Sequence, residues 1–269
     1  MPRERSGGEN LGALAGTLLA MQRLKLTAKA SGIARRGQPW LFGDDIAAGD
    51  PAPARLVRVE DENGRDLGLG ITGAGKIALR LCGPWPGDGV PSREEFFAAR
   101  LASAFAQRAE WRGAQDGARM VHGESDWLPG LVIDRFGPVL SVQATGAFVA
   151  ASLDSIVPFA AEQLGAECVV GRNDTQARRF EGLPEQVELL HGRRIDRVTI
   201  VEHGVRHTVR PFEGHKTGFY LDQRPARGLV RELAGGKSML DLFCYQGGFA
   251  LAGLVGGAKS VVAVDQSEP

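Results

Sequence analysis

Short alternating runs of apolar and polar residues dominate the first third of the chain, a pattern typical of half-buried strands. Residues 54–60 alternate in this way, and Asn63-Gly64 follows with a sequence that favours a tight hairpin turn. Two more strands are expected over residues 67–72 and 76–81. Strands at such short spacing predict a small β-barrel, which we expect over residues 23–83.

A helical pattern follows a segment rich in glycine and proline at residues 84–91. Ser92 and Glu95 have the spacing of a capping box, in which each side chain accepts a hydrogen bond from the other residue's backbone. Apolar residues then recur at helical spacing at Phe97, Leu101, Ala104 and Phe105. We therefore predict a linker and connecting helix within residues 84–119, the helix ending near Trp111.

The middle of the chain, residues 120–209, mixes strand and helix patterns and is predicted to form a second, α/β domain. Strands are expected over residues 131–135, 139–144 and 167–171, with a hairpin over 198–202 and 205–210. An apolar stripe from Leu153 to Leu164 indicates a helix that Gly165 ends. Pro158 lies within this stripe and predicts a kink or a later start of the helix.

From residue 210 the pattern becomes helix, strand, glycine-rich turn, helix and strand. Helices are expected over residues 223–234 and 249–255, and strands over 238–243 and 260–264. In the first helix Leu229, Val230 and Leu233 are expected to be buried. This is the α/β unit of a Rossmann-like domain, predicted for residues 210–269. Because two strands and one crossover cannot cover both sheet faces, an exposed apolar edge is expected at residues 261–264.

Overall composition and charge restrict the partners of this chain. Hydrophobic residues make up 43% and charged residues 24%, as in ordinary globular proteins. Lys+Arg and Asp+Glu both number 32, which argues against a polybasic binder. Five basic residues nevertheless occur between Met21 and Phe42 without an acidic one: Arg23, Lys25, Lys29, Arg35 and Arg36. They suggest either a polyanion-binding surface or an ordinary solvated face.

Cysteine, histidine and apolar-run patterns point to a cytoplasmic protein without metal or membrane. The three cysteines, Cys82, Cys168 and Cys244, form neither a disulfide framework nor a zinc pair. Residues 1–22 are expected to be a disordered extension. The apolar run within them is too short to span a membrane. His203, His207 and His215 straddle a hairpin and lack a matching acid or cysteine, which disfavours a metal site.

The turn after the strand at 238–243 indicates which nucleotide the last domain binds. The dinucleotide fingerprint G-x-G-x-x-G is absent, which disfavours a nicotinamide-dependent oxidoreductase. Asp241 precedes the turn and would repel a phosphate, but it would suit a ligand with an amine or a sulfonium. Asp265 follows 24 positions later, at the place of an acid that binds ribose hydroxyls. These residues favour S-adenosylmethionine as cofactor.

Three motifs occur in order and together carry a specific resemblance. They are Glu124-Ser125-Asp126-x-Leu128-Pro129-Gly130, His215-Lys216-Thr217-Gly218-Phe219-Tyr220-Leu221-Asp222-Gln223-Arg224 and Leu240-Asp241-Leu242-Phe243-Cys244-Tyr245-x-Gly247-Gly248-Phe249. From about Leu24 onward the chain resembles the class I S-adenosylmethionine-dependent rRNA methyltransferases that form 5-methylcytosine in large-subunit rRNA. That resemblance implies an N-terminal PUA RNA-binding barrel, a central α/β domain and a Rossmann-like methyltransferase domain.

The resemblance also implies roles for individual residues. Cofactor contacts are expected from Tyr220, Asp222, Gln223, Asp241, Phe243, Tyr245, Gly247, Gly248 and Asp265. RNA contacts are expected from Lys25, Lys29, Arg35, Arg36 and Trp40, with Trp40 either an RNA-stacking surface or part of the barrel core. Glu124 and Asp126 are expected to cap a turn rather than act as an acid–base pair. The partner is then large-subunit rRNA, and a dimer is compatible with the pattern.

Two parts of the family's catalytic machinery are expected beyond Pro269. The Pro-Pro motif and the nucleophilic cysteine of the family lie downstream of the second strand, so no catalytic residue is expected in this chain, which resembles a C-terminally truncated member. Cys244 lies nearest but is expected to be a small buried residue. The alternative is a non-catalytic RNA-binding protein with a vestigial methyltransferase domain.

Overall fold

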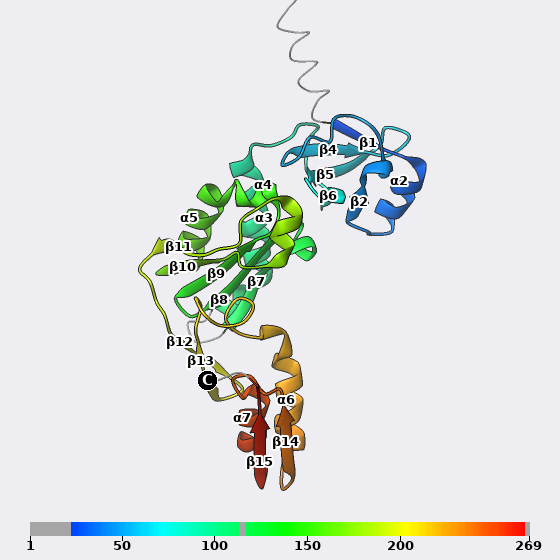
Figure 1. Ribbon diagram of the computed structural model, residues 1–269. Coiled ribbons are helices and arrows are strands. Elements are labelled where there is room, and N and C mark those ends of the chain that lie inside the picture. The colour runs from blue at the N-terminus through cyan, green and yellow to red at the C-terminus, as the bar shows by residue number, and fades with distance from the viewer. Residues whose placement is uncertain (1–22, 113–116, 267–269) are drawn as a thin grey trace, which may run out of the picture.

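The computed structural model describes residues 23–112 and 117–266, and these form three units that follow one another along an elongated molecule (Figure 1). The predicted extension at residues 1–22 lies outside the described residues. Within the described ranges, none of the helices is both long and apolar enough to cross a membrane.

The first unit is a curled sheet of six strands in the order β2-β6-β5-β4-β1-β3. Its elements are β1 (Arg23–Leu26), α2 (Ala28–Arg35), β2 (Trp40–Phe42), the 3₁₀ turn η1 (Gly43–Asp45), β3 (Ile46–Ala48), β4 (Leu56–Glu60), β5 (Asp66–Thr72) and β6 (Ile77–Gly83). The predicted hairpin at Asn63-Gly64 is confirmed, because β4 and β5 pair antiparallel around it. Fully buried leucines such as Leu24, Leu41 and Leu79 form the core of this sheet.

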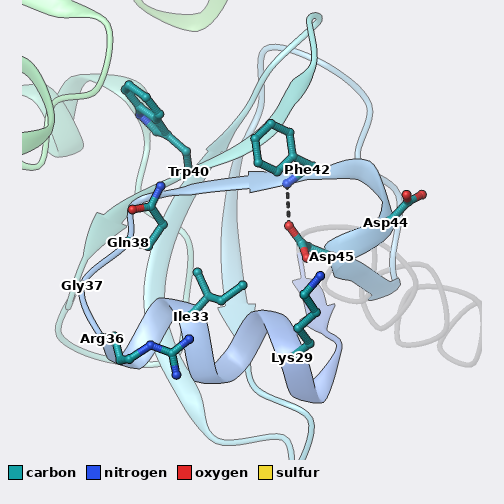
Figure 2. A pocket seen from close by; sticks show the side chains of 9 residues that line it. All are labelled: Lys29, Ile33, Arg36, Gly37, Gln38, Trp40, Phe42, Asp44 and Asp45. Atoms are coloured by element: carbon teal, nitrogen blue, oxygen red, sulfur yellow. Dashed lines mark hydrogen bonds between the residues drawn. The ribbon is translucent and has the colours of Figure 1, made fainter.

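Helix α2 was not foreseen from the hydrophobic pattern. It begins after Thr27, whose hydroxyl accepts a hydrogen bond from the Ala30 backbone N–H at 3.2 Å. Only Ala30 and Ser31 are buried in this helix, so its apolar stripe is too small to stand out in the sequence. The helix and the residue that follows it nevertheless bring Lys29 and Arg36 to a pocket whose other side is formed by strand β2 (Figure 2).

The second unit is a five-stranded sheet in the order β11-β10-β9-β8-β7. Its elements are α3 (Arg93–Gln107), η2 (Ala109–Arg112), β7 (Gly117–His122), η3 (Gly123–Asp126), β8 (Leu131–Phe136), β9 (Val139–Ala144), α4 (Ala147–Ala150), α5 (Leu153–Leu164), β10 (Cys168–Arg172), η4 (Gln176–Glu181) and β11 (Val187–Gly192). The capping box is confirmed: Ser92 Oγ accepts from Glu95 N, and Glu95 Oε2 accepts from Ser92 N. Helices α3 and α5 pack against each other and share one apolar core with this sheet.

Helix α5 starts at Leu153 and contains Pro158. The predicted alternative of a later helix start is therefore wrong. Gly165 ends it in the left-handed conformation with φ +61°, as predicted. Strands β7 and β11 lie at the two edges of the sheet and were not predicted. In β11 the exposed positions mix with half-buried ones, and this obscures the alternation that identifies a strand.

The third unit continues from an antiparallel hairpin of two strands, which was predicted to end the central domain and packs on Phe136 of its sheet, into a small parallel sheet. Its elements are β12 (Val198–Glu202), β13 (Val205–Val209), η5 (Leu221–Gln223), α6 (Arg224–Leu233), β14 (Ser238–Leu242), α7 (Gly248–Val255) and β15 (Ser260–Val264). Strands β14 and β15 are parallel and bring Asp241 opposite Ala263. The predicted order of strand, turn, helix and strand is therefore confirmed.

The apolar residues of α6 are more exposed to solvent than the sequence predicted. Leu229 and Leu233 are 55% and 57% exposed and Val230 is only half-buried, so the prediction that these three residues are buried is wrong. The helix instead buries Arg227, because the buried carboxylate of Glu202 in β12 attracts its guanidinium. The exposed apolar edge predicted at residues 261–264 is confirmed, since Val262 and Val264 are half exposed.

The first two units meet at a defined joint. The Trp127 side chain lies against Gly83 so closely that a Cβ added there would come within 2.5 Å of the indole ring. The Trp40 indole N–H donates a hydrogen bond to Glu124 Oε1 at 2.8 Å. On another side, Arg80 Nη2 donates to the buried Glu181 carboxylate at 2.7 Å. These contacts set the orientation of the six-stranded sheet relative to the five-stranded sheet.

Candidate cofactor pocket and nucleic-acid interface

A pocket of about 310 Å³ opens between η5, α6 and the turn that joins β14 to α7. Five of the nine predicted cofactor residues line it: Tyr220, Gln223, Phe243, Tyr245 and Gly248. Five further residues line it that the sequence interpretation did not select: Phe219, Arg227, Cys244, Gln246 and Phe249. The pocket is thus formed by two segments, one before the first parallel strand and one directly after it.

Asp241 does not line this pocket but caps the helix beneath it. Its Oδ2 accepts a hydrogen bond from the Ala250 backbone N–H at 3.0 Å, in the first turn of α7. Burial raises the pKa of Asp241, and the nearby Asp265 raises it further, whereas the bond from Ala250 opposes the shift. Asp241 therefore stabilises the turn on which the pocket is built.

Asp265 and Gly247 also lie behind the lining and shape the glycine-rich turn. Asp265 Oδ2 accepts a hydrogen bond from the Tyr245 backbone N–H at 2.7 Å. Tyr245 has a positive φ of +49°, which is uncommon for a residue with a side chain and shows how sharply the chain turns here. Gly247, at φ +71°, is the residue that precedes α7. The two residues hold the backbone of the turn in place.

Asp222 lies outside this pocket, on the other side of η5. Its Oδ2 accepts from Lys216 Nζ at 3.1 Å. Burial raises the pKa of Asp222, but the hydrogen bond and charge of Lys216 outweigh that effect and keep the pKa below its usual range. It lines a second cleft, described below.

Two aromatic rings that line the pocket, Tyr220 and Tyr245, form a cluster with His215, which lies outside the lining. His215 stacks on Tyr245 with ring centroids 4.3 Å apart and an interplanar angle of 12°. Tyr220 meets Tyr245 edge-on at 5.8 Å, and the Tyr245 hydroxyl accepts from the His215 backbone N–H at 3.0 Å. Aromatic faces of this kind suit an adenine ring or a sulfonium. His215 was missed as a site residue, although it belongs to the motif that carries the resemblance.

Cys244 is half-buried and lines the pocket, so the expectation of a fully buried residue is wrong. Burial raises the pKa of its thiol, and the carboxylates of Asp241 and Asp265 raise it further. The nucleophilic form of cysteine is the thiolate, which these groups disfavour.

The wall of the pocket is anchored on Glu202 of β12. Its carboxylate accepts from Arg227 Nε at 2.5 Å and from Arg224 Nε at 3.0 Å. Arg227 Nη2 in turn donates to the Tyr220 carbonyl at 3.0 Å. Burial raises the pKa of Glu202, but the Arg227 guanidinium outweighs that effect and keeps the pKa below its usual range. One buried carboxylate thus connects the hairpin, α6 and a residue of the pocket.

The three histidines that were considered for a metal site lie in separate environments. His207 is buried against Phe219, His215 stacks on Tyr245, and His203 Nε2 lies 3.3 Å from the Arg224 carbonyl. Across residues 23–112 and 117–266, the structure contains no cluster of three or more His, Cys, Asp or Glu that could hold a metal ion.

His207 should make stability depend on pH. Burial lowers its pKa, Arg227 lowers it further, and Glu202 opposes the shift. Since the unfolded chain titrates near pH ~6.5, it binds more protons than the folded chain below that pH. We expect the folded state to lose stability between about pH 7 and pH 5, and His207→Gln to reduce that loss. Urea unfolding at pH 7 and pH 5 measures the change in the free energy of unfolding between the two pH values. If that change were the same in His207→Gln as in the exposed-site variant His191→Gln, the expectation would be contradicted.

A larger pocket, of about 730 Å³, lies on the six-stranded sheet between α2 and β2 (Figure 2). Three of the five predicted RNA contacts line it: Lys29, Arg36 and Trp40. Trp40 is 42% exposed and Phe42 51%, and they project from the same face of β2 because they are two residues apart. The alternative in which Trp40 belongs to the barrel core is thereby excluded.

Lys25 and Arg35 lie away from this pocket. Lys25 is exposed on β1, and Arg35 binds the carboxylates of Asp61 and Glu62. Their proximity to the other basic residues in sequence therefore does not bring them to this pocket. Acidic side chains, Asp44 and Asp45, complete the pocket rim, so its charge is mixed rather than basic.

Glu124 and Asp126 have separate structural partners. Asp126 is buried, receives both amino groups of Arg108 at 2.9 and 3.0 Å, and accepts from the His122 backbone N–H at 2.6 Å. Glu124 accepts from Trp40. Both carboxylates stabilise the turn and the joint, as the sequence favoured, rather than forming an acid–base pair.

Fold and site together define the class of protein. Residues 160–269 match the family profile of the S-adenosylmethionine-dependent methyltransferases, and residues 24–82 match that of PUA-like domains. The chain thus combines a PUA-like domain with a methyltransferase domain whose class uses S-adenosylmethionine, as predicted.

Relatives that share one name match most of this chain. The chain is 36% identical over 252 residues to ribosomal RNA large subunit methyltransferase I of Shewanella amazonensis, covering 91% of this chain and 63% of the relative. It is 38% identical over 245 residues to the protein of that name from Photobacterium profundum, covering 87% and 60%. The chain therefore spans about three fifths of the length of these relatives.

Solved structures share the fold. A protein from Streptococcus mutans described as a SAM-dependent methyltransferase superposes with a TM-score of 0.76 at 22% identity, over 92% of this chain and 64% of its own. A structure described as a methyltransferase complexed with SAH gives a TM-score of 0.77 at 22% identity, over 92% and 63%. At this identity, the similarity establishes a common fold.

Proposed function

We propose that this chain binds S-adenosylmethionine in the pocket between η5 and the β14–α7 turn and belongs to an enzyme that methylates large-subunit rRNA, forming 5-methylcytosine. The observation that carries the proposal is the convergence of two motif segments, distant in sequence, on one aromatic-lined pocket in a methyltransferase-type domain. The names of the relatives support rRNA as the acceptor. The cytosine product rests on the motif resemblance, and a cytoplasmic location accompanies the proposal.

We assign the cofactor contacts in two groups. Tyr220, Gln223, Phe243, Tyr245 and Gly248 are proposed to touch the cofactor, because they line the pocket. Asp241, Gly247 and Asp265 are proposed to act from the turn behind it, with Asp265 also reaching the ribose hydroxyls, and Asp222 is proposed to act from the neighbouring wall. The Arg227 guanidinium, which also lines the pocket, is added to the first group, and His215 is proposed to support Tyr245 by stacking on it.

The PUA-like domain is proposed to contact the RNA through the pocket between α2 and β2. Trp40 and Phe42 offer exposed rings for stacking, while Lys29 and Arg36 offer cations for phosphates (Figure 2). Glu124 fixes the Trp40 indole from the central domain. Lys25 and Arg35 are proposed as peripheral contacts only.

Asp265→Asn should weaken S-adenosylmethionine binding about tenfold, because an anionic acceptor for the ribose hydroxyls is replaced by a neutral amide. The asparagine oxygen can still accept from Tyr245 N, so the turn is expected to remain intact. Isothermal titration of both proteins with S-adenosylmethionine measures the difference, and the exposed-site variant Asp196→Asn serves as a control. Equal affinities would remove Asp265 from the site.

The same titration separates the proposal from its alternative. A non-catalytic RNA-binding protein with a vestigial domain would show no heat of S-adenosylmethionine binding. Deletion of the gene followed by mapping of 5-methylcytosine in large-subunit rRNA tests the substrate, and an unchanged methylation map would overturn it. The catalytic cysteine predicted beyond Pro269 stays a prediction that the coding sequence past codon 269 tests, and the predicted dimer is tested by sedimentation.

A further inference from the structure

A cleft of about 290 Å³ lies where the central sheet meets η5 and α6. Its lining is Arg108, Gly117, Ala118, Arg119, His122, Leu221, Asp222 and Arg224. The three arginines come from three places: the residue after α3, strand β7 and the first turn of α6. Segments far apart in sequence thus bring three guanidinium groups to one hollow.

Each guanidinium is held by a carboxylate buried behind it. Arg108 binds Asp126 through two bonds of 2.9 and 3.0 Å, Arg119 binds Asp134 at 2.8 and 2.9 Å, and Arg224 binds Glu202 at 3.0 Å. The arginine side chains are 21%, 33% and 18% exposed, whereas the three carboxylates are 2%, 0% and 2% exposed. A ligand entering the cleft therefore meets the cations and not the anions that hold them.

This arrangement favours a phosphate. Guanidinium groups match the geometry of phosphate oxygens, and fixed side chains lose little conformational entropy when they bind. The hydrogen bond from Arg119 to Asp134 raises the pKa of Arg119 and keeps it charged. Asp222 on the rim opposes an anion, but its charge is compensated by Lys216 at 3.1 Å. The exposed imidazole of His122 adds a further polar group.

The cleft adjoins the cofactor pocket through a common wall. Leu221 and Asp222 of η5 face the cleft, while their neighbours Tyr220 and Gln223 face the cofactor pocket. Glu202 binds Arg224, which lines the cleft, and Arg227, which lines the pocket. A strand whose phosphate occupied the cleft would pass directly beside the methyl donor.

We propose that the cleft of Arg108, Arg119 and Arg224 binds a backbone phosphate of the acceptor RNA close to the methylated nucleotide, an inference that rests on the proposed function. The PUA-like pocket then contacts the RNA at a distance, and this cleft contacts it at the reaction site. The two contact sites lie in different parts of the fold. The PUA-like pocket lies on the first sheet, and the arginine cleft lies between the second and third units.

The test removes one cation without changing net charge. In the double variant Arg119→Gln/Asp134→Asn the pair becomes neutral, and the new side-chain amide at position 134 would still offer Thr217 Oγ1 an acceptor, as the carboxylate does. The probe is a fluorescein-labelled single-stranded RNA of about 20 nucleotides, titrated by anisotropy at several salt concentrations. We expect weaker binding and a slope of log K against log salt that is smaller by about 0.7, the value for one lost phosphate contact on a single strand.

The control is Arg193→Gln/Glu167→Gln, which neutralises an exposed arginine–carboxylate pair at the far edge of the central sheet. It should leave the slope unchanged. If the Arg119 variant fails to fold, His122→Glu decides instead, because it adds an anion to the cleft without touching an ion pair. A slope unchanged in the folded cleft variants would overturn the inference.

A third arm separates this inference from the proposed function. Trp40→Ala should weaken RNA binding through loss of stacking while leaving the salt slope almost unaltered. If Trp40→Ala weakens binding and the cleft variants do not, the cleft inference fails and the proposed RNA-binding function stands. If the wild-type protein itself binds neither RNA nor S-adenosylmethionine, the proposed function fails.

Discussion

Replacing Glu202 with alanine should lower the free energy of unfolding by about 3–5 kcal/mol, because it leaves two arginines beside a vacated, buried anion site. Glu202 is 4% exposed and is bound by both Arg224 and Arg227. The loss should also release the Tyr220 carbonyl, which Arg227 holds at 3.0 Å. We therefore expect S-adenosylmethionine binding to be lost together with stability.

Urea unfolding followed by tryptophan fluorescence and circular dichroism measures the first effect, and titration calorimetry measures the second. The control is Glu232→Ala, a removal of the same side chain from an exposed position of α6. Surface substitutions of that kind usually change stability by no more than ~0.5 kcal/mol. If Glu202→Ala were as mild as its control, Glu202 would not be the anchor of the pocket wall.

Replacing Gly68 with alanine should destabilise the PUA-like sheet by about 3 kcal/mol or more, because backbone strain and a steric clash act together. Gly68 has φ +97°, a conformation that residues with a side chain rarely adopt. A Cβ there would overlap the carbonyl oxygen of Gly83 and lie 2.6 Å from its carbonyl carbon. Both obstacles are backbone atoms of β6, so neither can rotate away.

Gly64 provides the matched control for that substitution. It also has a positive φ, +78°, but nothing lies within 4 Å of the place where a Cβ would stand. Gly64→Ala should therefore cost only about 1 kcal/mol, the conformational penalty alone. Thermal unfolding and amide exchange of β5 compare the two variants. Similar destabilisation by both would show that contact with β6 contributes little.

Elements with strong local signals could be predicted from the sequence. The capping box of α3, the Asn63-Gly64 hairpin and the strand at residues 260–264 depend on neighbours within a few residues, and all three are present. Helix α2 has only two buried residues and β11 has none, so their patterns are weak, whereas β7 is largely buried but contains no alternation of apolar and polar residues. The elements that were not predicted are those whose apolar residues do not recur at regular spacing.

Long-range polar contacts were the main part that the sequence could not reveal. Arg227 replaced the leucines as the buried residue of α6 because Glu202, 25 positions earlier, offered it a buried anion. Trp40 was fixed as a surface residue by Glu124, 84 positions later. Such pairs follow from the tertiary arrangement, and neither partner carries a local signature of the other.

The candidate site was predicted in part for the same reason. Residues next to the turn, such as Phe243 and Tyr245, line the pocket because their position in the motif determines where they lie. Asp241 and Asp265 were expected to contact the cofactor, and one oxygen of each carboxylate holds a backbone N–H group of the turn behind the pocket. Their contact with the cofactor stays a prediction.

The joint at Gly83 has a consequence for the substrate. Because Trp127 packs on Gly83 and Glu124 holds Trp40, the PUA-like pocket cannot swing freely relative to the central sheet. If the RNA makes both proposed contacts, this joint holds the PUA-like pocket at a fixed distance from the central sheet, and the RNA binds best when its two recognised features lie at that distance. Lengthening the RNA between them by one nucleotide should then be penalised more than changing the bases in that interval.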